Sequence, residues 1–456
     1  MKASVLSILL LLSAPVAKAS VVAIIDSGTD YLHKDLARQM WTNANEVEAN
    51  NRDEDLNGYV DDYYGWNFAE NNHQVIDYSY LGTLDADIKK FFEVQGKMMD
   101  GTATQDEIDW ARGMIQDQEF IKKISIYGNF MHGTHVAGIA AKGNLDSQIL
   151  AVKLIPTEVK LPFSIIKELE KLKKLKSKNQ EGARMWLLKQ GLGLLAGQQM
   201  VLLTEIARYV GSHKADIANG SFGTGFAQAK MIVGALAKTV LGRDPSEQEV
   251  EELSIFFLDK LVAEGKKMVM EAEDTLFVWA AGNDGTNNDQ YPTSPANIKS
   301  NNSITVAASF GTAELARFSN YGVDMVDVAA PGVSINSTVP GNEYLEVSGT
   351  SQAAPLVANV AAQIKDANPE LLPKQIKDII MSTVDKKSWL ATKVKSGGVV
   401  NNNRAVKAGV LSNTMKVSDA IAQAQKVVKD LPTMKSVSRQ GDSSLVLPLP
   451  GMFKVK

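Results

Sequence analysis

The chain has 456 residues, 45% of them hydrophobic and 22% charged, which is enough apolar material for one large domain or two ordinary ones and excludes a disordered or fibrous protein. Lys and Arg number 48 against 52 Asp and Glu, and the resulting net charge of -4 gives no sign of a nucleic-acid or membrane-surface partner. The sequence has no cysteine, so its stability must come from the size of its core and from any bound ions.

Residues 1–19 have the pattern of a secretory signal peptide. Lys2 precedes an apolar run from Val5 to Leu12, and Ala17-Lys18-Ala19 supplies small residues for a cleavage site. We therefore predict a mature chain that begins at Ser20 and is exported, either to a periplasm or out of the cell. No later apolar run approaches the length needed to span a bilayer.

Short runs of apolar and β-branched residues predict buried strands. These runs are Val21–Ile25, Ile149–Leu154, Ala215–Ala218, Leu276–Ala280, Ser303–Ala308 and Met325–Ala329. Helical patterns separate most of them, as expected when helices on both faces of a sheet join parallel strands. The predicted fold class is α/β, a three-layer doubly wound sandwich with a mostly parallel central sheet.

Three polar helical stretches interrupt this pattern, at about 83–125, 157–198 and 226–273. In the second, apolar residues recur at helical spacing from Ser164 with lysines between them, which favours a solvated helix surface over a binding site. A tail over about 411–456 contains one amphipathic helix, Val417–Lys429, and is interpreted as an appendage.

Two polar residues stand where α/β folds place their sites. Asp26 ends the first predicted strand, at the carboxyl edge of the sheet. His132 is predicted to open a helix whose small residues permit the close packing that a rigidly held base needs. His132 and His135 are spaced to ligate a metal as well, but no nearby Glu or Cys completes a zinc set.

Two further motifs are suited to stabilise a negative oxygen. Asn283 follows a predicted strand, and its side-chain amide can donate to an oxyanion, although Asn-Asp-Gly is also a common turn sequence. Gly349 and Thr350 let the backbone turn into an apolar helix, so Ser351 would stand at a helix N-terminus with Pro355 in the first turn. Unpaired N–H groups and the helix dipole favour an anion there. Taken alone, Gly-Thr-Ser fits an ordinary Ser N-cap better.

With Asp26, His132, Asn283 and Ser351 in this order, the sequence resembles the subtilisin-like serine peptidases. The resemblance rests on Ile25-Asp-Ser-Gly28, His132-Gly-Thr-His-Val-Ala-Gly138, Ala280-Ala-Gly-Asn283 and Ser348-Gly-Thr-Ser351, with support from Ala353-Ala-Pro355, Asn219-Gly-Ser-Phe-Gly223, Phe318-Ser-Asn-Tyr-Gly322 and Ala330-Pro-Gly332. These motifs cover most of residues 21–156 and 199–408. The resemblance implies a peptidase domain over 20–410 that carries the helical insertions, followed by an extension over 411–456.

The resemblance implies an exported serine endopeptidase that acts on protein or peptide substrates. Ser351 Oγ would attack the peptide carbonyl, His132 would take its proton and return it to the leaving amine, and Asp26 would hold the imidazole. Asn283 and the Ser351 N–H would bind the oxyanion. His135 is interpreted as structural.

The resemblance also implies where substrate would bind. An extended peptide would pair as a strand beside Ser221, Phe222 and Gly223. Its first side-chain pocket would be walled by that segment and by Ala280, Ala281 and Gly282. Because these residues are small or apolar, they favour a hydrophobic residue before the cut.

A run of acidic and amide residues around a glycine turn predicts a structural calcium site. Its ligands would be Asp53, Asp55, Asn57, Tyr59 and Asp61. Tyr64 stands where an EF-hand has its bidentate Glu, so the loop is not an EF-hand. A plain acidic loop is the alternative interpretation. Similar loops bind calcium in the family that the chain resembles, where Asp35 also matches a calcium ligand, but the sequence shows no partner for it.

Two features depart from that family. The first predicted strand begins within two residues of the predicted cleavage site, which leaves no room for an N-terminal pro-domain. We therefore expect either unaided folding or restraint by another segment, namely an inserted helical region or the tail, and residues 83–125 would emerge near the rim of the cleft. Gln352 follows the serine where the family has Met, and it adds a polar side chain at the base of the cleft.

Two alternative functions follow from the same residues. A catalytically silent relative would bind peptides through its helical insertions, and a zinc hydrolase would hold its metal through His132 and His135. The presence of all four catalytic groups favours the peptidase. The sequence does not determine the oligomeric state.

Overall fold

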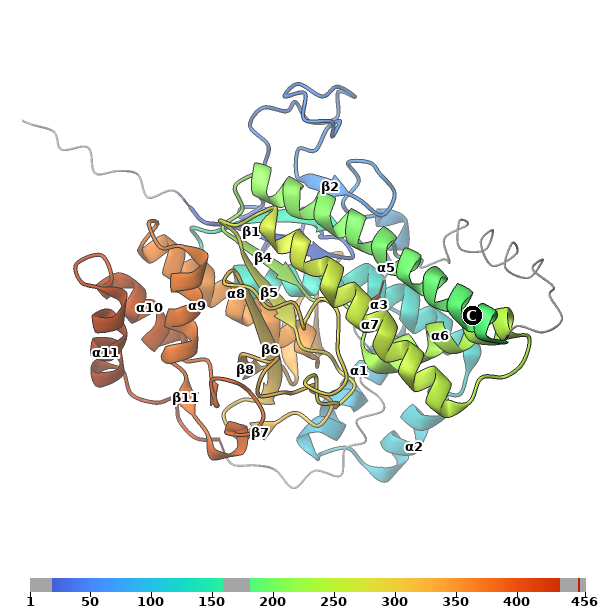
Figure 1. Cartoon of the computed structure of the whole chain (residues 1–456). Coiled ribbons are helices and arrows are strands. Elements are labelled where there is room, and N and C mark those ends of the chain that lie inside the picture. Colours follow the sequence, from blue (N-terminus) through green and yellow to red (C-terminus); the bar gives the residue numbers. More distant parts are fainter. Residues whose placement is uncertain (1–18, 159–180, 435–449, 452–456) are drawn as a thin grey trace, which may run out of the picture.

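The computed structural model describes residues 19–158, 181–434 and 450–451. Among these residues, ten strands form one sheet in the order β11-β12-β8-β6-β5-β4-β1-β3-β2, with β7 beside β6 (Figure 1). Its pairs are parallel except for β11 with β12 and β6 with β7. A separate antiparallel pair is formed by β9 and β10. The predicted α/β class with a mostly parallel central sheet is confirmed.

The strands are β1 Val21–Asp26, β2 Gly65–Asn67, β3 Gln148–Lys153, β4 Ile217–Gly220, β5 Leu276–Ala280, β6 Ser303–Phe310, β7 Glu314–Leu315, β8 Val328–Pro331, β9 Ile335–Val339, β10 Glu343–Val347, β11 Asp385–Lys386 and β12 Gly398–Val399. The helices are α1 Ala86–Asp100, α2 Gln105–Met114, α3 Gln118–Ala141, α5 Glu181–Ser212, α6 Phe226–Leu241, α7 Glu247–Met270, α8 Thr350–Ala367, α9 Pro373–Ser382, α10 Asn402–Leu411 and α11 Val417–Val427, with 3-10 turns at Tyr78–Tyr80 and Ser388–Leu390.

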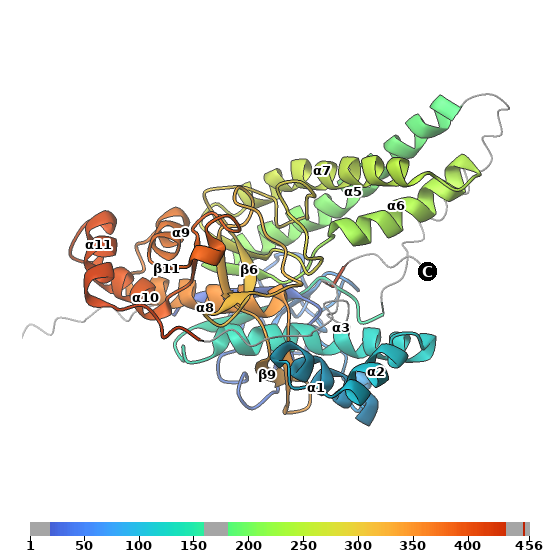
Figure 2. The same ribbon diagram turned by 90° about the horizontal axis from the view of Figure 1, so that it is seen from below.

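Alternate residues of β1 pack into two different cores, which places a helical layer on each face of the sheet. Val22 and Ile24 pack in one core with residues of α3, α8, α9 and α10. Ala23 and Ile25 point the other way, into a core with α5, α6 and α7. Figure 2 shows α5, α6 and α7 on one side of the sheet and α3 and α8 on the other. A continuous apolar run is what a strand covered on both faces requires.

The first helical insertion builds a small core of its own. Phe91, Phe92 and Phe120 from α1 and α3 pack with Leu345 of the β9–β10 hairpin. A capping box at Thr104 starts α2, because the Thr side chain accepts from the Glu107 N–H and the Glu107 side chain bonds back to the Thr104 backbone. This insertion therefore continues directly into the helix that carries His132.

Two predicted helix positions are wrong. His132 does not open a helix, because Asp117 caps α3 and the helix runs for fourteen residues, 118 to 131, before it. Pro355 is not in the first turn but is the sixth residue of α8. The apolar residues of the insertion extend α3 before His132. Helix α8 tolerates the missing N–H of Pro355 because Ser221 Oγ donates to Ser351 O in its place.

Five of the six predicted strands are confirmed within two residues at each end, and the sixth, Met325–Ala329, is shifted by three residues at its start. Strand β4 starts at Ile217 because Lys214 adopts a left-handed φ of 54°, which turns the chain after α5. Strand β8 starts at Val328 because the Val326 N–H is held in a turn by Gly322 O. The helical run predicted from Ser164 and most of the tail beyond Met434 lie outside the described residues.

Each helix in the described part of the chain is either too short or too polar to cross a lipid bilayer.

Candidate active site

Asp26 and His132 form a buried hydrogen-bonded pair at the carboxyl edge of the sheet. Asp26 is the last residue of β1 and is fully buried, and its Oδ1 lies 2.7 Å from His132 Nδ1. The same oxygen accepts from the Ser27 N–H at 2.7 Å. Because an ionised carboxylate only accepts, the imidazole carries its proton on Nδ1, which leaves the Nε2 lone pair available as a base.

Small residues let helix α3 approach β1 closely enough to make this pair. A Cβ on Gly133 would lie 2.2 Å from Gly28 O, so no side chain fits there. The Gly133 N–H donates to Ser27 Oγ at 3.1 Å. On the next turn a Cβ on Gly138 would lie 2.2 Å from Thr338 Oγ1. The packing predicted from the small residues is therefore present, although His132 lies within the helix rather than at its start.

Ser351 is the second residue of α8 and is bonded to Ser221 in both directions. Ser351 Oγ donates to Ser221 O at 3.1 Å, and Ser221 Oγ donates to Ser351 O at 2.9 Å. Ser351 O can accept this bond because its usual helical partner is position 355, where Pro355 has no N–H. Within the described residues, the Ser351 hydroxyl thus bonds to Ser221 rather than to His132.

Asn283 is held against the start of α8 by Thr350. Asn283 Oδ1 accepts from the Thr350 N–H at 2.9 Å and from Thr350 Oγ1 at 2.7 Å. Thr350 Oγ1 also accepts from the Gly282 N–H at 3.2 Å. A Cβ on Gly349 would lie 3.3 Å from Asn283 Nδ2, so the amide nitrogen lies beside the turn that leads to Ser351. The prediction missed Thr350, although its hydroxyl is adjacent to Ser351 in the sequence.

The predicted substrate-binding segment lies beside Ser351, but most of its side chains belong to the core. Phe222 is 2% exposed, and its ring packs edge-on against Trp279. Ala280 and Ala281 are fully buried. A Cβ on Gly282, at φ 120°, would lie 2.3 Å from Asn320 Nδ2. The Gly223 N–H donates to Pro450 O at 3.0 Å, so part of the C-terminal tail already contacts this edge.

His135 and Gln352 form a buried contact behind the active-site residues. His135 Nε2 lies 2.9 Å from Leu345 O, and its Nδ1 lies 3.5 Å from Gln352 Nε2. Burial lowers the pKa of His135 to about 4, so this imidazole is neutral at ordinary pH. Since His135 and His132 bond to different partners, they do not converge on a metal. Gln352 is buried against His135 rather than exposed in a cleft.

Part of the predicted calcium set converges, with a residue that the prediction missed. Carboxylate oxygens of Glu46, Asp53 and Asp55 lie within 4.8 Å of one another. Glu46 Oε2 is buried and has no hydrogen-bond partner among the described residues. Burial, together with the charges of Asp62 and Glu54, raises the pKa of Glu46. This site therefore carries negative charge that a cation would neutralise.

The other predicted calcium ligands face elsewhere. Asp61 accepts from the backbone N–H groups of Asn50 and Asn51 at 2.9 and 2.8 Å. The Tyr59 ring packs against Trp66, Phe68 and Tyr209. Asn57 Nδ2 donates to Asp62 Oδ2 at 3.2 Å. The five predicted ligands do not converge as a set because left-handed residues such as Leu56 and Asp61 redirect the side chains.

A second acidic group already has its protein donors. Asp55, Asp62 and His213 lie within 4.8 Å of one another. Burial alone would raise the pKa of Asp62, but hydrogen bonds from His213, Asn43 and Tyr209 outweigh burial and lower it. Its charge is compensated without an ion, so the group at Glu46 is the better cation site. Asp35, for which no partner was predicted, accepts from the Tyr344 hydroxyl at 2.6 Å.

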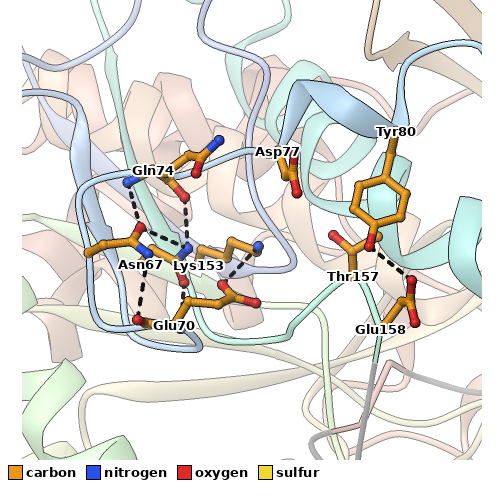
Figure 3. A pocket seen from close by; sticks show the side chains of 9 residues that line it. Asn67, Glu70, Gln74, Asp77, Tyr80, Lys153, Thr157 and Glu158 are labelled. Carbon is orange, nitrogen blue, oxygen red and sulfur yellow. Dashed lines mark hydrogen bonds and ion pairs between the residues drawn. The ribbon is translucent and has the colours of Figure 1, made fainter.

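A polar pocket of about 200 Å³ opens beside the strand next to Asp26 (Figure 3). Lys153 of β3, the sheet partner of Asp26, is 3% exposed and bonds to Glu70 at 3.0 Å. Across the pocket, the Tyr80 hydroxyl donates to Glu158 at 3.0 Å. The remaining lining residues are Asn67, Asn72, Gln74, Asp77 and Thr157. This pocket places charged and polar side chains beside β3, the strand that pairs with β1 at Asp26.

Comparisons with known proteins agree with the motifs. The model of the subtilase family matches residues 17–409. Subtilisin-like protease 1 of Plasmodium vivax is 26% identical over 88% of this chain and 49% of its own length. Subtilisin BL of Lederbergia lenta is 36% identical over 29% of this chain and 46% of its own length. The chain thus spans about half the length of these relatives. The epidermin leader peptide processing serine protease of Staphylococcus aureus is 15% identical, covers 88% of this chain and 76% of that chain, and has a TM-score of 0.45.

Proposed function

The chain belongs to the subtilase family of serine peptidases, and on that premise we propose that it is an exported endopeptidase that hydrolyses peptide bonds with Ser351 as its nucleophile. The observation that carries the proposal is the 2.7 Å contact between Asp26 and His132 at the carboxyl edge of the sheet, because a buried carboxylate in that position fixes the tautomer that makes His132 a base. Export rests on the pattern of residues 1–19, of which the first 18 lie outside the described residues.

In the proposed reaction, Ser351 Oγ bonds to the substrate carbonyl carbon while its proton passes to His132 Nε2. The C=O electron pair moves onto oxygen. When that pair returns, the C–N bond breaks, and His132 donates its proton to the departing amine, which leaves an acyl ester on Ser351. Water then attacks the acyl ester in the same way: His132 takes a proton from the water and returns it to Ser351 Oγ as the carboxylic acid leaves. Asp26 stabilises the imidazolium without taking its proton.

The Ser351 hydroxyl must rotate before this reaction. Its hydrogen bond to Ser221 O directs the proton away from His132. That bond is a single neutral one, so exchanging it for a bond to an imidazole costs little. A substrate strand that pairs with the same carbonyl would compete for Ser221 O and favour the rotation. Catalytic hydrogen bonds commonly form only when substrate is bound.

The oxyanion would be held by the Asn283 amide and by the Ser351 N–H at the start of α8. Thr350 donates twice to Asn283 Oδ1, which fixes the orientation of the amide beside the start of α8. Donors fixed before the reaction stabilise the developing charge without reorganising. Substrate would extend along the backbone of residues 221–223, beside Ser351.

We assign a structural calcium ion to Glu46, Asp53 and Asp55 in place of the ligand set predicted from the sequence. Three carboxylates converge there, which suits a hard cation with oxygen ligands. The ion would supply charge neutralisation to the loop and would take no part in the reaction.

The first test compares the chain from Ser20 with its Ser351→Ala variant. Casein hydrolysis is measured for both proteins, and both are treated with a serine-directed phosphonate. We expect the wild type to cleave casein and to be labelled, and the variant to do neither. A folded wild type that neither cleaves nor is labelled would instead favour the silent peptide-binding relative. Loss of activity to a zinc chelator without labelling would favour the metal hydrolase.

A further inference from the structure

The tail residues Pro450 and Gly451 lie on the edge where we place the substrate. Pro450 O accepts from the Gly223 N–H at 3.0 Å. Gly451 lies beside α6, where a Cβ on it would be 2.9 Å from Gln228 Nε2. Figure 2 shows this short segment, at the red end of the colour bar, near the start of α6. The contact joins residues 223 and 450, which are 227 positions apart in the sequence.

The same edge is bonded to the proposed nucleophile. Ser221, two residues before Gly223, exchanges two hydrogen bonds with Ser351. Two residues of extended chain span roughly 7 Å, so the tail contact lies within one short peptide of Ser351. On the other side of Gly223, Thr224 is paired in both directions with Ser294. Between Ser221 and Thr224, the backbone N–H of Gly223 is therefore a position where an incoming strand can pair with this edge.

We propose that Pro450 and Gly451 act as a tethered ligand of the substrate-binding edge, which a substrate must displace from Gly223. This inference rests on the proposed function, because it takes residues 221–223 to be the substrate-binding edge. Gly223 is buried, and a buried backbone N–H needs an acceptor. Pro450 O supplies that acceptor, and a substrate carbonyl would replace it.

The tail is anchored to the domain before it reaches this edge. Arg404 donates to Asp430 at 2.6 Å, and the Leu431 N–H donates to Asp385 at 2.6 Å. The Met434 N–H donates to Thr312 Oγ1 at 2.9 Å. From Met434 to Pro450 is sixteen positions, which can span up to roughly 50 Å. Because Pro450 belongs to the same chain as the edge, it competes with substrate within one molecule, where even weak binding can be significant.

The tail is suited to be displaced rather than to block the edge permanently. Strand addition normally gains one hydrogen bond in each direction, but Pro450 has no N–H to return to the edge. A substrate with an ordinary residue in this position can make both bonds. The tail should therefore raise KM for substrate without lowering kcat.

A truncation after Leu449 tests the proposal, because it removes Pro450 and Gly451 and keeps the anchors up to Met434. We expect KM for a peptide substrate to fall at least about threefold with kcat unchanged. This is the change expected if the tethered competitor has an effective concentration of about twice its Kd and is then removed. A synthetic peptide of residues 445–456 should restore the inhibition competitively. An unchanged KM, with no inhibition by the peptide, overturns the proposal.

A binding measurement separates failure of this proposal from failure of the proposed function. The truncated chain with Ser351→Ala should bind the labelled 445–456 peptide by fluorescence polarisation, and full-length Ser351→Ala should bind it at least threefold more weakly. Peptide binding by a protein that neither cleaves casein nor reacts with a phosphonate would support the tail site and refute the peptidase. Cleavage without peptide binding would keep the peptidase and refute the tail site.

Cross-linking tests the contact itself in the full chain. Because the sequence has no cysteine, Gln228→Cys with Gly451→Cys introduces a unique pair. We expect a short bis-maleimide to join them within one chain. The matched control is Gln228→Cys with Val427→Cys on α11, which Figures 1 and 2 both place on the far side of the molecule from α6. Equal cross-linking of the two pairs would refute the contact.

Discussion

The proposed active site and the acidic loop over residues 46–62 are held by the fold in opposite ways. Asp26, His132 and Ser351 are each at most 7% exposed and lie on a buried strand or helix. The loop instead contains four non-glycine residues with left-handed φ near 60°, namely Ala49, Asn51, Leu56 and Asp61. Such conformations are costly and persist only when their surroundings hold them. The proposed active site is therefore fixed by packing, whereas the loop depends on its hydrogen bonds and on the proposed ion.

The largest expected effect concerns the active site alone. Asn283→Ala removes the proposed oxyanion donor, and in subtilisin such a loss costs on the order of 10²–10³ in kcat. We expect a loss of this size with little change in KM or in the free energy of unfolding, measured by peptide hydrolysis and urea denaturation. As the control, Asn287→Ala, four positions later in the same loop, should keep most of the activity. A large rise in KM at unchanged kcat would mean that Asn283 binds the ground state instead.

The second prediction tests the packing behind the active site through its pH dependence. The pKa of His135 is lowered by burial to about 4, below its unfolded value near 6.5, so between these values the unfolded chain binds a proton that the folded chain does not. The free energy of unfolding should therefore fall by about 3 kcal/mol as the pH drops through this window. Urea denaturation at pH 7.5 and 4.5 measures it.

His135→Gln should lose correspondingly less stability on acidification, because it has no imidazole to protonate in the unfolded chain. The exposed His73 provides the control, and His73→Gln should behave as the wild type. Equal acid sensitivity of His135→Gln and the wild type would mean that His135 is not held neutral by burial.

The third prediction addresses the loop. If calcium binds at Glu46, Asp53 and Asp55, then calcium at 100 times its Kd should stabilise the protein by about 2.7 kcal/mol and raise its Tm by several degrees. A chelator should remove this effect and leave kcat unchanged while the protein stays folded. Glu46→Gln should lose most of the stabilisation by calcium. Asp61→Asn should retain this stabilisation, because Asp61 bonds to backbone amides. Equal calcium responses in both variants would place the ion elsewhere.

The same contrast explains what the sequence could predict. Asp26 and Ser351 were placed correctly in the fold because continuous apolar runs mark the strand and helix that hold them, and such runs reflect burial directly. Glu46 was missed because it precedes Asp53 by seven positions and joins it only through the turns of the loop. The contact between Gly223 and Pro450 has no local signal at all. The start of α3 at Gln118 was missed because an inserted helix became continuous with the predicted one.

A smaller loss of activity is expected when the hydroxyl of Thr350 is removed. Thr350→Val keeps the shape of the side chain but removes the hydroxyl that donates to Asn283 Oδ1 and accepts from the Gly282 N–H. Thr350 does not touch the substrate, so it acts by positioning Asn283, and the loss of one such hydrogen bond, about 1.4 kcal/mol, corresponds to about a tenfold fall in kcat. Thr350→Ser should restore most of the activity.

The double variant decides whether Thr350 works through Asn283. If it does, Thr350→Val adds nothing once Asn283→Ala has removed the amide, so the double variant should have the kcat of Asn283→Ala alone. If the two residues acted independently, the fold losses in kcat would multiply, and the double variant would be about tenfold slower than Asn283→Ala. Purely structural damage by Thr350→Val would lower the free energy of unfolding in both backgrounds, which urea denaturation of the same proteins would reveal. The coupling therefore separates a positioning residue from one that only stabilises the start of α8.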